Sequence, residues 1–402
     1  MDVVSKPVSA VVAGHICLDV IPTLAPSTEE SFREAFRPGR LIEAGVALLS
    51  PGGLVSNAGL ALHALGIPTT LAAKVGDDPF GDIVRELVES HGSGLSAGLK
   101  VDGESSTPYT LIVSPPGVDR LFLHHPGAAG SFGAEDIDFA LLERSTLFHF
   151  GYPPLMRRMY RNGGRGLVDL FERARATGVT TSLDMSYPDP ASESGHVDWR
   201  EILEAVLPFV DVFSPSLDEL LFMLRRPLFE QLSRQRLAPD PSEPALLHEL
   251  GEELAELGVG IAAIKLGERG LYLKTGTPER IAALGRARPS DPADWAGREL
   301  WAPCFEVEVA GTTGAGDATV AGLLTALLRG LDAESAVTAA VAVGACDVER
   351  TDALSGLRSW EETLARMRSD WRRLPLELDD PAWSWKPAKQ LWMRIPETRS
   401  AR

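Results

Sequence analysis

The sequence predicts an α/β fold with a mostly parallel central sheet and a small additional β-sheet. Short apolar or β-branched runs alternate with longer segments of helical periodicity along most of the chain. Repeated strand–helix–strand units of this kind form a parallel sheet that helices cover on both faces. A predicted hairpin, residues 109–114 and 121–124 around a Pro-Pro-Gly turn, interrupts the alternation and indicates a β appendage.

Local signals place the elements of the N-terminal part. Residues 8–14 form a β-branched run that ends in glycine, which is typical of a buried strand. Residues 55–65 read as a helix that ends at Gly66, and residues 69–75 as the next strand. A further helix begins with Asp78 as N-cap, Pro79 follows at the first helical position, and the helix ends at Gly92.

The alternation continues through the rest of the chain. The predicted strands are 147–150, 180–184, 210–214, 260–266 and 305–309, and the predicted helices are 166–177, 199–207, 245–257 and 318–328. Residues 276–300, rich in Pro, Gly and charge, predict an irregular insertion. We expect one domain over residues 1–375 and a C-terminal extension over residues 376–402.

Composition excludes several classes of protein. The chain has 402 residues, 44% of them apolar, and 39 Lys+Arg against 56 Asp+Glu give a net charge of −17. An acidic balance argues against a nucleic-acid or membrane-surface partner. The longest charge-free apolar runs, 318–328 and 335–346, are shorter than the ~18–20 residues of a membrane span. Three scattered cysteines without a CxxC pair predict the reducing cytoplasm and no zinc site.

The most informative stretch is residues 309–320. A predicted strand leads into a loop with Gly311, Gly314 and Gly316, and an apolar helix follows at once. Glycines let the backbone approach a ligand closely, and the free N–H groups of a first helical turn favour an anion. Asp317 lies at the same end of the helix, where a carboxylate beside a phosphate site can take a proton from an attacking hydroxyl.

A simpler interpretation is that Asp317 only caps the helix and that the glycines form a tight turn. Two threonines, three glycines and an aspartate in one strand–helix junction favour the functional interpretation. The loop is not a Walker A loop, since no lysine follows the glycines, and it contains no G-x-G-x-x-G fingerprint.

The segment TTGAGD at 312–317 resembles the C-terminal signature of the ribokinase-like (PfkB) carbohydrate kinases. GGLVSNA at 52–58, with VGDDPFGD at 75–82, resembles the N-terminal signature of the same family. The resemblance covers roughly residues 8–368. It implies a three-layer α/β/α ribokinase-like fold with a small β-sheet lid, built from segments near 14–24, 40–54 and 105–126.

The resemblance also implies an ATP-dependent kinase that acts on a sugar or a sugar-like alcohol. Asp317 would be the general base for the attacking hydroxyl, and the amides of Gly314, Ala315 and Gly316 would form the anion hole. The residues implied in sugar binding are Asp19, Gly52, Gly53 and Asn57. For Asp19 a solvated turn residue, and for Asn57 a helix-start residue, are the simpler interpretations.

On the nucleotide side, Pro-Ser-x-x-Glu at 215–219 resembles a family motif that organises Mg²⁺ and phosphates, with Glu219 acting on the metal through water. KLGERG at 265–270 resembles a nucleotide loop at a strand end. The residues implied in nucleotide binding are Ser216, Lys265, Gly267, Gly270, Thr312 and Thr313. An ordinary capped helix and a glycine turn are the simpler interpretations of these two segments.

Four positions depart from the family pattern: Gly311 replaces a usual Asp, Ser216 a usual Asn, Ser186 an Asn and Ala129 an Asn. Gly311 calls activation by a monovalent cation into question. We therefore predict a cytoplasmic sugar kinase that uses ATP and Mg²⁺, without nucleic-acid or membrane partners, for which a homodimer is possible. The alternatives are a nucleoside kinase of the same family and a catalytically weak sugar or nucleotide sensor.

Overall fold

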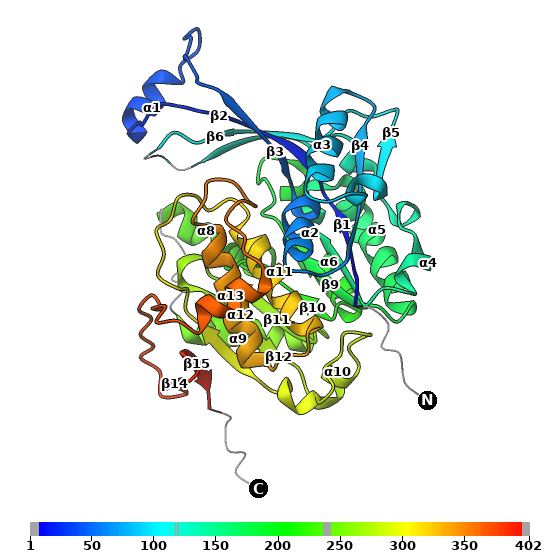
Figure 1. Cartoon of the computed structure of the whole chain (residues 1–402), viewed down its shortest axis with the longest axis vertical. Coiled ribbons are helices and arrows are strands. Elements are labelled where there is room, and N and C mark those ends of the chain that lie inside the picture. Colours follow the sequence, from blue (N-terminus) through cyan, green and yellow to red (C-terminus); the bar gives the residue numbers. More distant parts are fainter. Residues whose placement is uncertain (1–7, 117, 119, 236–242, 396–402) are drawn as a thin grey trace, which may run out of the picture.

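The structure is a computed structural model that describes residues 8–116, 118, 120–235 and 243–395. Its centre is a sheet of eleven strands in the order β14-β15-β13-β12-β11-β10-β9-β8-β1-β4-β5 (Figure 1). Within this order, the strands β11, β10, β9, β8, β1, β4 and β5 run parallel to one another. At the other end of the sheet, β12, β13, β15 and β14 each pair antiparallel with their neighbours. Their bounds are β1 Ala10–Gly14, β4 Thr69–Gly76, β5 Leu99–Asp102, β8 Leu147–Gly151, β9 Thr180–Asp184, β10 Val212–Phe213, β11 Ile261–Lys265, β12 Leu271–Thr275, β13 Glu299–Ala302, β14 Trp383–Lys386 and β15 Leu391–Arg394.

Two apolar cores, one on each face of the sheet, make the fold three-layered. Along β1, Ala10 and Val12 pack into one core, and Val11 and Ala13 pack into the other, as the alternation of a strand requires. The helices of the first face are α2 Leu54–Ala64, α3 Pro79–Ser90, α11 Ala315–Leu328, α12 Ala333–Asp347 and α13 Trp360–Met367. Those of the second face are α4 Phe139–Leu142, α5 Arg157–Ala176, α6 Trp199–Val206, α7 Leu217–Leu224, α8 Arg226–Gln235 and α9 Pro244–Glu256. The predicted α/β fold class is confirmed.

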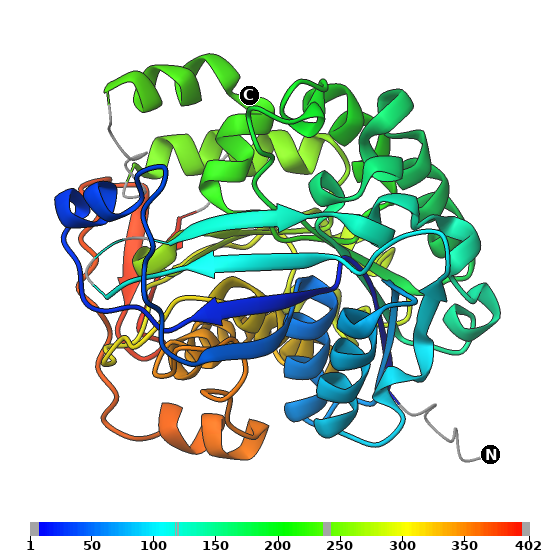
Figure 2. The ribbon, with the colours of Figure 1, turned by 90° about the horizontal axis from the view of Figure 1, so that it is seen from above.

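A second sheet of four strands lies across the top of the molecule (Figure 2). Its order is β3-β2-β6-β7, with β2 Cys17–Pro22, β3 Ala47–Gly52, β6 Tyr109–Val113 and β7 Leu121–His125, and the short helix α1 Glu29–Ala35 connects β2 to β3. We call this sheet the lid. It starts within three residues of the end of β1, so the first strand of the body leads directly into it.

The chain changes direction in the main sheet at β1. From β1 it continues to β4 and β5 on one side, and it later returns through β8 on the other side. Such a switch point opens a crevice at the carboxyl ends of the strands. Gly14 and Gly151 pair there, and the backbones are so close that a Cβ on Gly14 would lie 2.4 Å from the Gly151 carbonyl oxygen.

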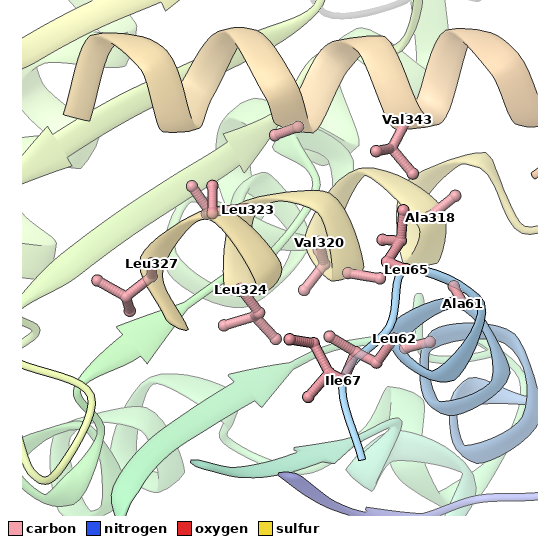
Figure 3. Packing of buried hydrophobic residues seen from close by; sticks show 14 of the residues in the cluster. Ala61, Leu62, Leu65, Ile67, Ala318, Val320, Leu323, Leu324, Leu327 and Val343 are labelled. Carbon is pink, nitrogen blue, oxygen red and sulfur yellow. The ribbon is translucent and has the colours of Figure 1, made fainter. Parts of the chain in front are cut away.

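Helix α11 is apolar on all sides because it is buried between α2 and α12. Leu62 and Ile67, from α2 and the turn after it, lie against Leu324 of α11, and Val343 of α12 lies near Ala318 (Figure 3). This packing fixes the N-terminus of α11 at the upper edge of the sheet.

One predicted strand does not form, and two segments without a clear local pattern contain regular structure. Residues 305–309 do not form a strand: the edge of β13 is occupied by β15, and Phe305 instead stacks on Trp371 with ring centroids 4.1 Å apart. Residues 276–300, which were predicted to be an irregular insertion, contain helix α10 Pro278–Ala282 and bury Trp295 completely. The tail adds β14 and β15 to the main sheet and buries Trp383.

Candidate active site

A cleft of about 1260 Å³ lies between the lid and the carboxyl ends of the parallel strands. Its walls come from the ends of β1, β8, β9 and β11, from the lid strands, and from the first turns of α2, α7 and α11. Most predicted site residues line it: Asp19, Gly53, Asn57, Ser216, Glu219, Lys265, Gly267, Thr312, Thr313, Gly314, Gly316 and Asp317. The fold thus brings together segments up to about 300 residues apart in the sequence.

Asp317 lies in the first turn of α11 and is only 3% exposed. Asn57 Nδ2 donates a hydrogen bond to its Oδ2 at 2.9 Å, and the Tyr152 hydroxyl lies 2.8 Å from both carboxylate oxygens. Burial raises the pKa of Asp317, while the Lys265 ammonium and these two donors oppose the shift. The site therefore holds a partly dehydrated carboxylate in a fixed orientation.

The glycine-rich loop meets the lid directly in front of α11. Gly314 has a φ of 80° as the N-cap, so it takes the left-handed conformation that favours glycine. Arg120, in the lid just before β7, donates from Nη1 to Thr313 Oγ1 at 2.8 Å. The first-turn N–H groups of α11 have no acceptor within the helix, so this end of the cleft favours an anion.

Lys265, at the end of β11, extends toward the same loop. Its Nζ lies 2.6 Å from Asp184 Oδ1 at the end of β9, and 3.8 Å from where a Cβ on Gly316 would stand. Burial raises the pKa of Asp184 to about 7, although Lys265 opposes the shift. The ammonium of Lys265 is thus a buried positive charge beside the glycine loop.

Ser216 and Glu219 form the capping box of α7 predicted by the simpler interpretation. The Ser216 amide donates to Glu219 Oε2 at 2.7 Å, and Ser216 Oγ accepts from the Glu219 amide at 3.3 Å. Both residues also line the cleft. Gly270 does not line it: a Cβ there would lie 2.0 Å from the Ala302 carbonyl oxygen, so its role in the structure is a close strand turn.

Asp19 projects from lid strand β2 into the cleft and is 8% exposed. Burial raises its pKa to about 6, while hydrogen bonds from Cys17 and Thr110 lower it. A Cβ on Gly52 would lie 2.2 Å from Asp19 Oδ2, and one on Gly53 would lie 2.5 Å from His15 Nδ1. These two glycines therefore make space for the side chains of Asp19 on β2 and of His15 just before β2.

The cleft residues that sequence reasoning missed include His15, Arg120, His124 and Tyr152. His124 is half-buried and packs against His15, with ring centroids 5.0 Å apart. Their positions were the available signals: His15 directly follows β1, Tyr152 directly follows β8, and His124 lies on the lid strand β7. The distance between these segments in the sequence hid their proximity.

Residues 10–360 match the family model described as pfkB family carbohydrate kinase. The chain is 26% identical over 298 residues to a protein named uncharacterized sugar kinase from Archaeoglobus fulgidus, which covers 74% of this chain and 98% of that protein. It is 28% identical to the 2-dehydro-3-deoxygluconokinase of Thermoproteus tenax, over 78% of this chain and 84% of that protein.

Solved structures share the fold at low sequence identity. The ribokinase of Thermotoga maritima superposes with a TM-score of 0.65 at 20% identity, covering 90% of this chain and all of that one. Arabidopsis thaliana ribokinase complexed with ribose and ATP gives 0.64 at 17% identity, covering 90% and 99%. The fold and the family model define the class as sugar kinases. The chain belongs to the pfkB family of carbohydrate kinases.

Within the described part of the chain, every helix is too short or too polar to cross a membrane.

Proposed function

We propose that this protein transfers the γ-phosphate of ATP to a hydroxyl of a sugar or sugar-like alcohol, with Asp317 as general base and the amides of Gly314, Ala315 and Gly316 as the anion hole. The observation that carries the proposal is the buried carboxylate of Asp317 on the first turn of α11, directly beside the glycine loop. A base and an anion-binding loop at one point are what phosphoryl transfer to a hydroxyl requires.

The hydrogen bonds of Asp317 leave room for an acceptor hydroxyl. A carboxylate has about four lone-pair sites, and it receives only two protons here, one from Asn57 and the single Tyr152 hydroxyl proton that its two oxygens share. A raised pKa makes Asp317 a better proton acceptor than a solvated aspartate, while the two donors and Lys265 stabilise its ionised form.

The opposite side of the glycine loop suits a nucleoside triphosphate with Mg²⁺. Lys265 supplies a buried positive charge, and Thr312, Thr313 and Gly267 line the same end of the cleft. Glu219 supplies a carboxylate, the ligand type that Mg²⁺ prefers, and it is 8% exposed at the cleft wall. Bound Mg²⁺ would neutralise phosphate charge. A structure of an Escherichia coli ribokinase II in complex with ATP and Mg²⁺, which shares this fold, supports this assignment.

We propose further that no monovalent cation is needed. A side chain at position 311 has no space, because a Cβ on Gly311 would lie 2.8 Å from Thr351 Cα. The aspartate that the family usually carries there is therefore not accommodated. The rate of ADP release should therefore be the same in a buffer that contains potassium and in a buffer whose monovalent cation is a bulky organic one.

The replacement Asp317→Asn tests the proposed function. It removes the base while keeping the side-chain shape, so turnover should fall by about 10²–10⁴-fold with little change in Tm. The measurement is ADP release with Mg²⁺ and ATP over a panel of pentoses, hexoses and nucleosides. Asp82→Asn, an exposed aspartate in the first turn of α3, is the matched control and should keep full activity.

Near wild-type turnover of the Asp317→Asn variant would refute the role of Asp317. Thermal stabilisation by sugars without ADP formation across the whole panel would instead favour a sensor, and preference for nucleosides would favour a nucleoside kinase. A homodimer, the absence of nucleic-acid partners and the cytoplasmic location stay predictions.

A further inference from the structure

The acceptor side of the cleft contains buried polar atoms without a partner. His15 is 1% exposed and Asn57 7% exposed, and both line the cleft. Both ring nitrogens of His15, Asn57 Oδ1 and His124 Nε2 have no hydrogen-bond partner among the described residues. Leaving buried polar groups unpaired is costly, so four such atoms from three chain segments in one cleft point to a bound ligand that satisfies them.

The neighbouring hydrogen bonds decide which of these atoms accept. The Asp19 carboxylate accepts a hydrogen bond from the Cys17 thiol at 3.3 Å, and the Thr110 hydroxyl also stabilises its ionised form. The contact of 3.1 Å between Thr110 Oγ1 and His124 Nδ1 allows either atom to donate, and we assign the proton to His124 Nδ1 because the Thr110 hydroxyl is then free to donate toward the Asp19 carboxylate. A neutral imidazole that donates from Nδ1 accepts at Nε2. Burial lowers the pKa of His124 to about 4, so the ring is neutral.

The subsite is thus rich in hydrogen-bond acceptors. They are His124 Nε2, Asn57 Oδ1 and the carboxylates of Asp19 and Asp317, together with one nitrogen of His15, whose pKa burial holds well below its ordinary value. Acceptors of this kind match hydroxyl donors. A carboxylate or phosphate group on the ligand offers only acceptors and negative charge, and it would face Asp19 and Asp317 in a site of low dielectric constant.

The cations that line the cleft are at its phosphate end. Arg120 donates to Thr313 in the glycine loop, Lys265 pairs with Asp184, and Arg269 lies in the turn after β11 next to Gly267. Their positions match the triphosphate rather than the acceptor. His125, the next residue along β7, bonds to Ser106 and does not line the cleft, so it takes no part in the subsite.

We propose that His15, His124 and Asn57, with Asp19, form an acceptor subsite that selects an uncharged polyhydroxy compound and rejects sugar acids and sugar phosphates. The proposal rests on the proposed kinase function and narrows its substrate class. It separates this chain from its relative 2-dehydro-3-deoxygluconokinase, which is named for an acidic sugar.

The first experiment compares acceptors on the wild-type protein. Neutral probes are D-fructose and D-ribose, and charged probes are D-gluconate, 2-dehydro-3-deoxygluconate and D-fructose 6-phosphate. Binding is measured by calorimetry without nucleotide, and phosphorylation by ADP release. We expect the best neutral probe to bind and to react at least about 10²-fold better than every charged probe. Repulsion by the Asp19 and Asp317 carboxylates and the lack of a partner for the anion should each weaken binding about tenfold or more. A charged probe that binds or reacts best overturns the proposal, and so does the absence of binding by every neutral probe.

The second experiment tests the acceptor at position 124. His124→Phe keeps an aromatic ring and removes Nε2, so the Kd of the best neutral probe should rise about tenfold, the effect of one lost hydrogen bond. His125→Phe, at the neighbouring position outside the cleft, should bind like the wild type. Binding of Mg²⁺ and ATP and the Tm serve as checks that the variant is folded. An unchanged Kd in a folded His124→Phe variant contradicts the proposal.

These outcomes remain distinguishable from a failure of the proposed function. If neutral sugars bind with the expected selectivity but no ADP forms, the subsite stands and the kinase function fails. If ADP forms best with a sugar acid, the kinase function stands and the subsite fails.

Discussion

Among single residues, Tyr152 has the most unusual backbone in the cleft. Its φ of 64° and ψ of 41° lie in the left-handed region, which costs a residue with a Cβ about 1–2 kcal/mol. The surrounding structure determines this conformation: the Tyr152 amide donates to the Asp184 carbonyl at 3.2 Å, and the hydroxyl reaches Asp317. Strain of this kind is concentrated at functional sites.

Replacing Tyr152 by Phe should impair the base without unfolding the protein. The variant loses a hydrogen bond to a charged group, worth about 1.5–3 kcal/mol. Without this donor the ionised form of Asp317 is less stable, so its pKa rises further and the acidic limb of the kcat profile should move to higher pH by about one unit or more. The measurement is kcat against pH from about 5 to 9.

Tyr160→Phe is the control for this experiment, because Tyr160 also lines the cleft but packs against Trp199 and has no bond to Asp317. Its pH profile should match that of the wild type. If Tyr152→Phe lowers kcat without moving the acidic limb, Tyr152 does not act through the ionisation of Asp317.

Among the elements, helix α11 carries the site because its position is fixed on two sides. It packs on α2, which carries Asn57, and on α12 (Figure 3). The loop in front of it depends on Gly314, where a Cβ would lie 2.4 Å from Ala353 Cβ. Loop geometry and helix packing are therefore coupled at one residue.

Replacing Gly314 by Ala should reduce both activity and stability. The backbone conformation at φ 80° costs about 1–2 kcal/mol for alanine, and the contact with Ala353 shifts the anion-binding amides, so kcat should fall by about 10²-fold. Gly330→Ala is the matched control at the other end of α11, since Gly330 has a φ of 74° and nothing within 4 Å of its Cβ position. The similar backbone strain in Gly330→Ala should lower Tm, while kcat should stay unchanged. Equal kcat in both variants would contradict the role of the loop.

For the whole molecule, a buried acid links the free energy of unfolding to pH. Asp347, the last residue of α12, is fully buried, and neither carboxyl oxygen has a partner among the described residues. Burial, followed by the charges of Asp317 and Asp352, raises its pKa to about 8. An unfolded aspartate has a pKa of about 3.9. Between these values the folded state keeps a proton that the unfolded state has lost, so stability falls as pH rises toward 8.

Asp347→Asn should therefore flatten the dependence of stability on pH. The wild type loses up to about 1.4 kcal/mol per pH unit from this group alone, and the neutral amide loses none. Urea unfolding at pH 6 and pH 8 measures the difference. Asp370→Asn, on the surface, is the control and should keep the wild-type slope. Identical slopes for the wild type and Asp347→Asn would contradict the prediction.

Local patterns in the sequence predicted most of the fold and, within the candidate site, the glycine loop that leads into the helix of Asp317. The strand at 180–184 was predicted with the observed bounds, and the cap at Asp78 was confirmed by its hydrogen bond to the Gly81 amide at 2.9 Å. The loop at 312–317 was predicted to lead into α11, and it does. Caps, periodicity and glycine turns are properties of neighbouring residues, so a sequence shows them directly.

The sequence by itself determined the three-layer architecture, the family and the placement of Asp317 at a helix start. Only the tertiary structure decided that Tyr152 and Asn57 bind this carboxylate, that His15 faces His124, and that the tail becomes two strands of the main sheet. These contacts join segments between about 90 and 260 residues apart. Such pairs form because packing and strand order bring chain ends to one edge of the sheet, and no local pattern encodes that proximity.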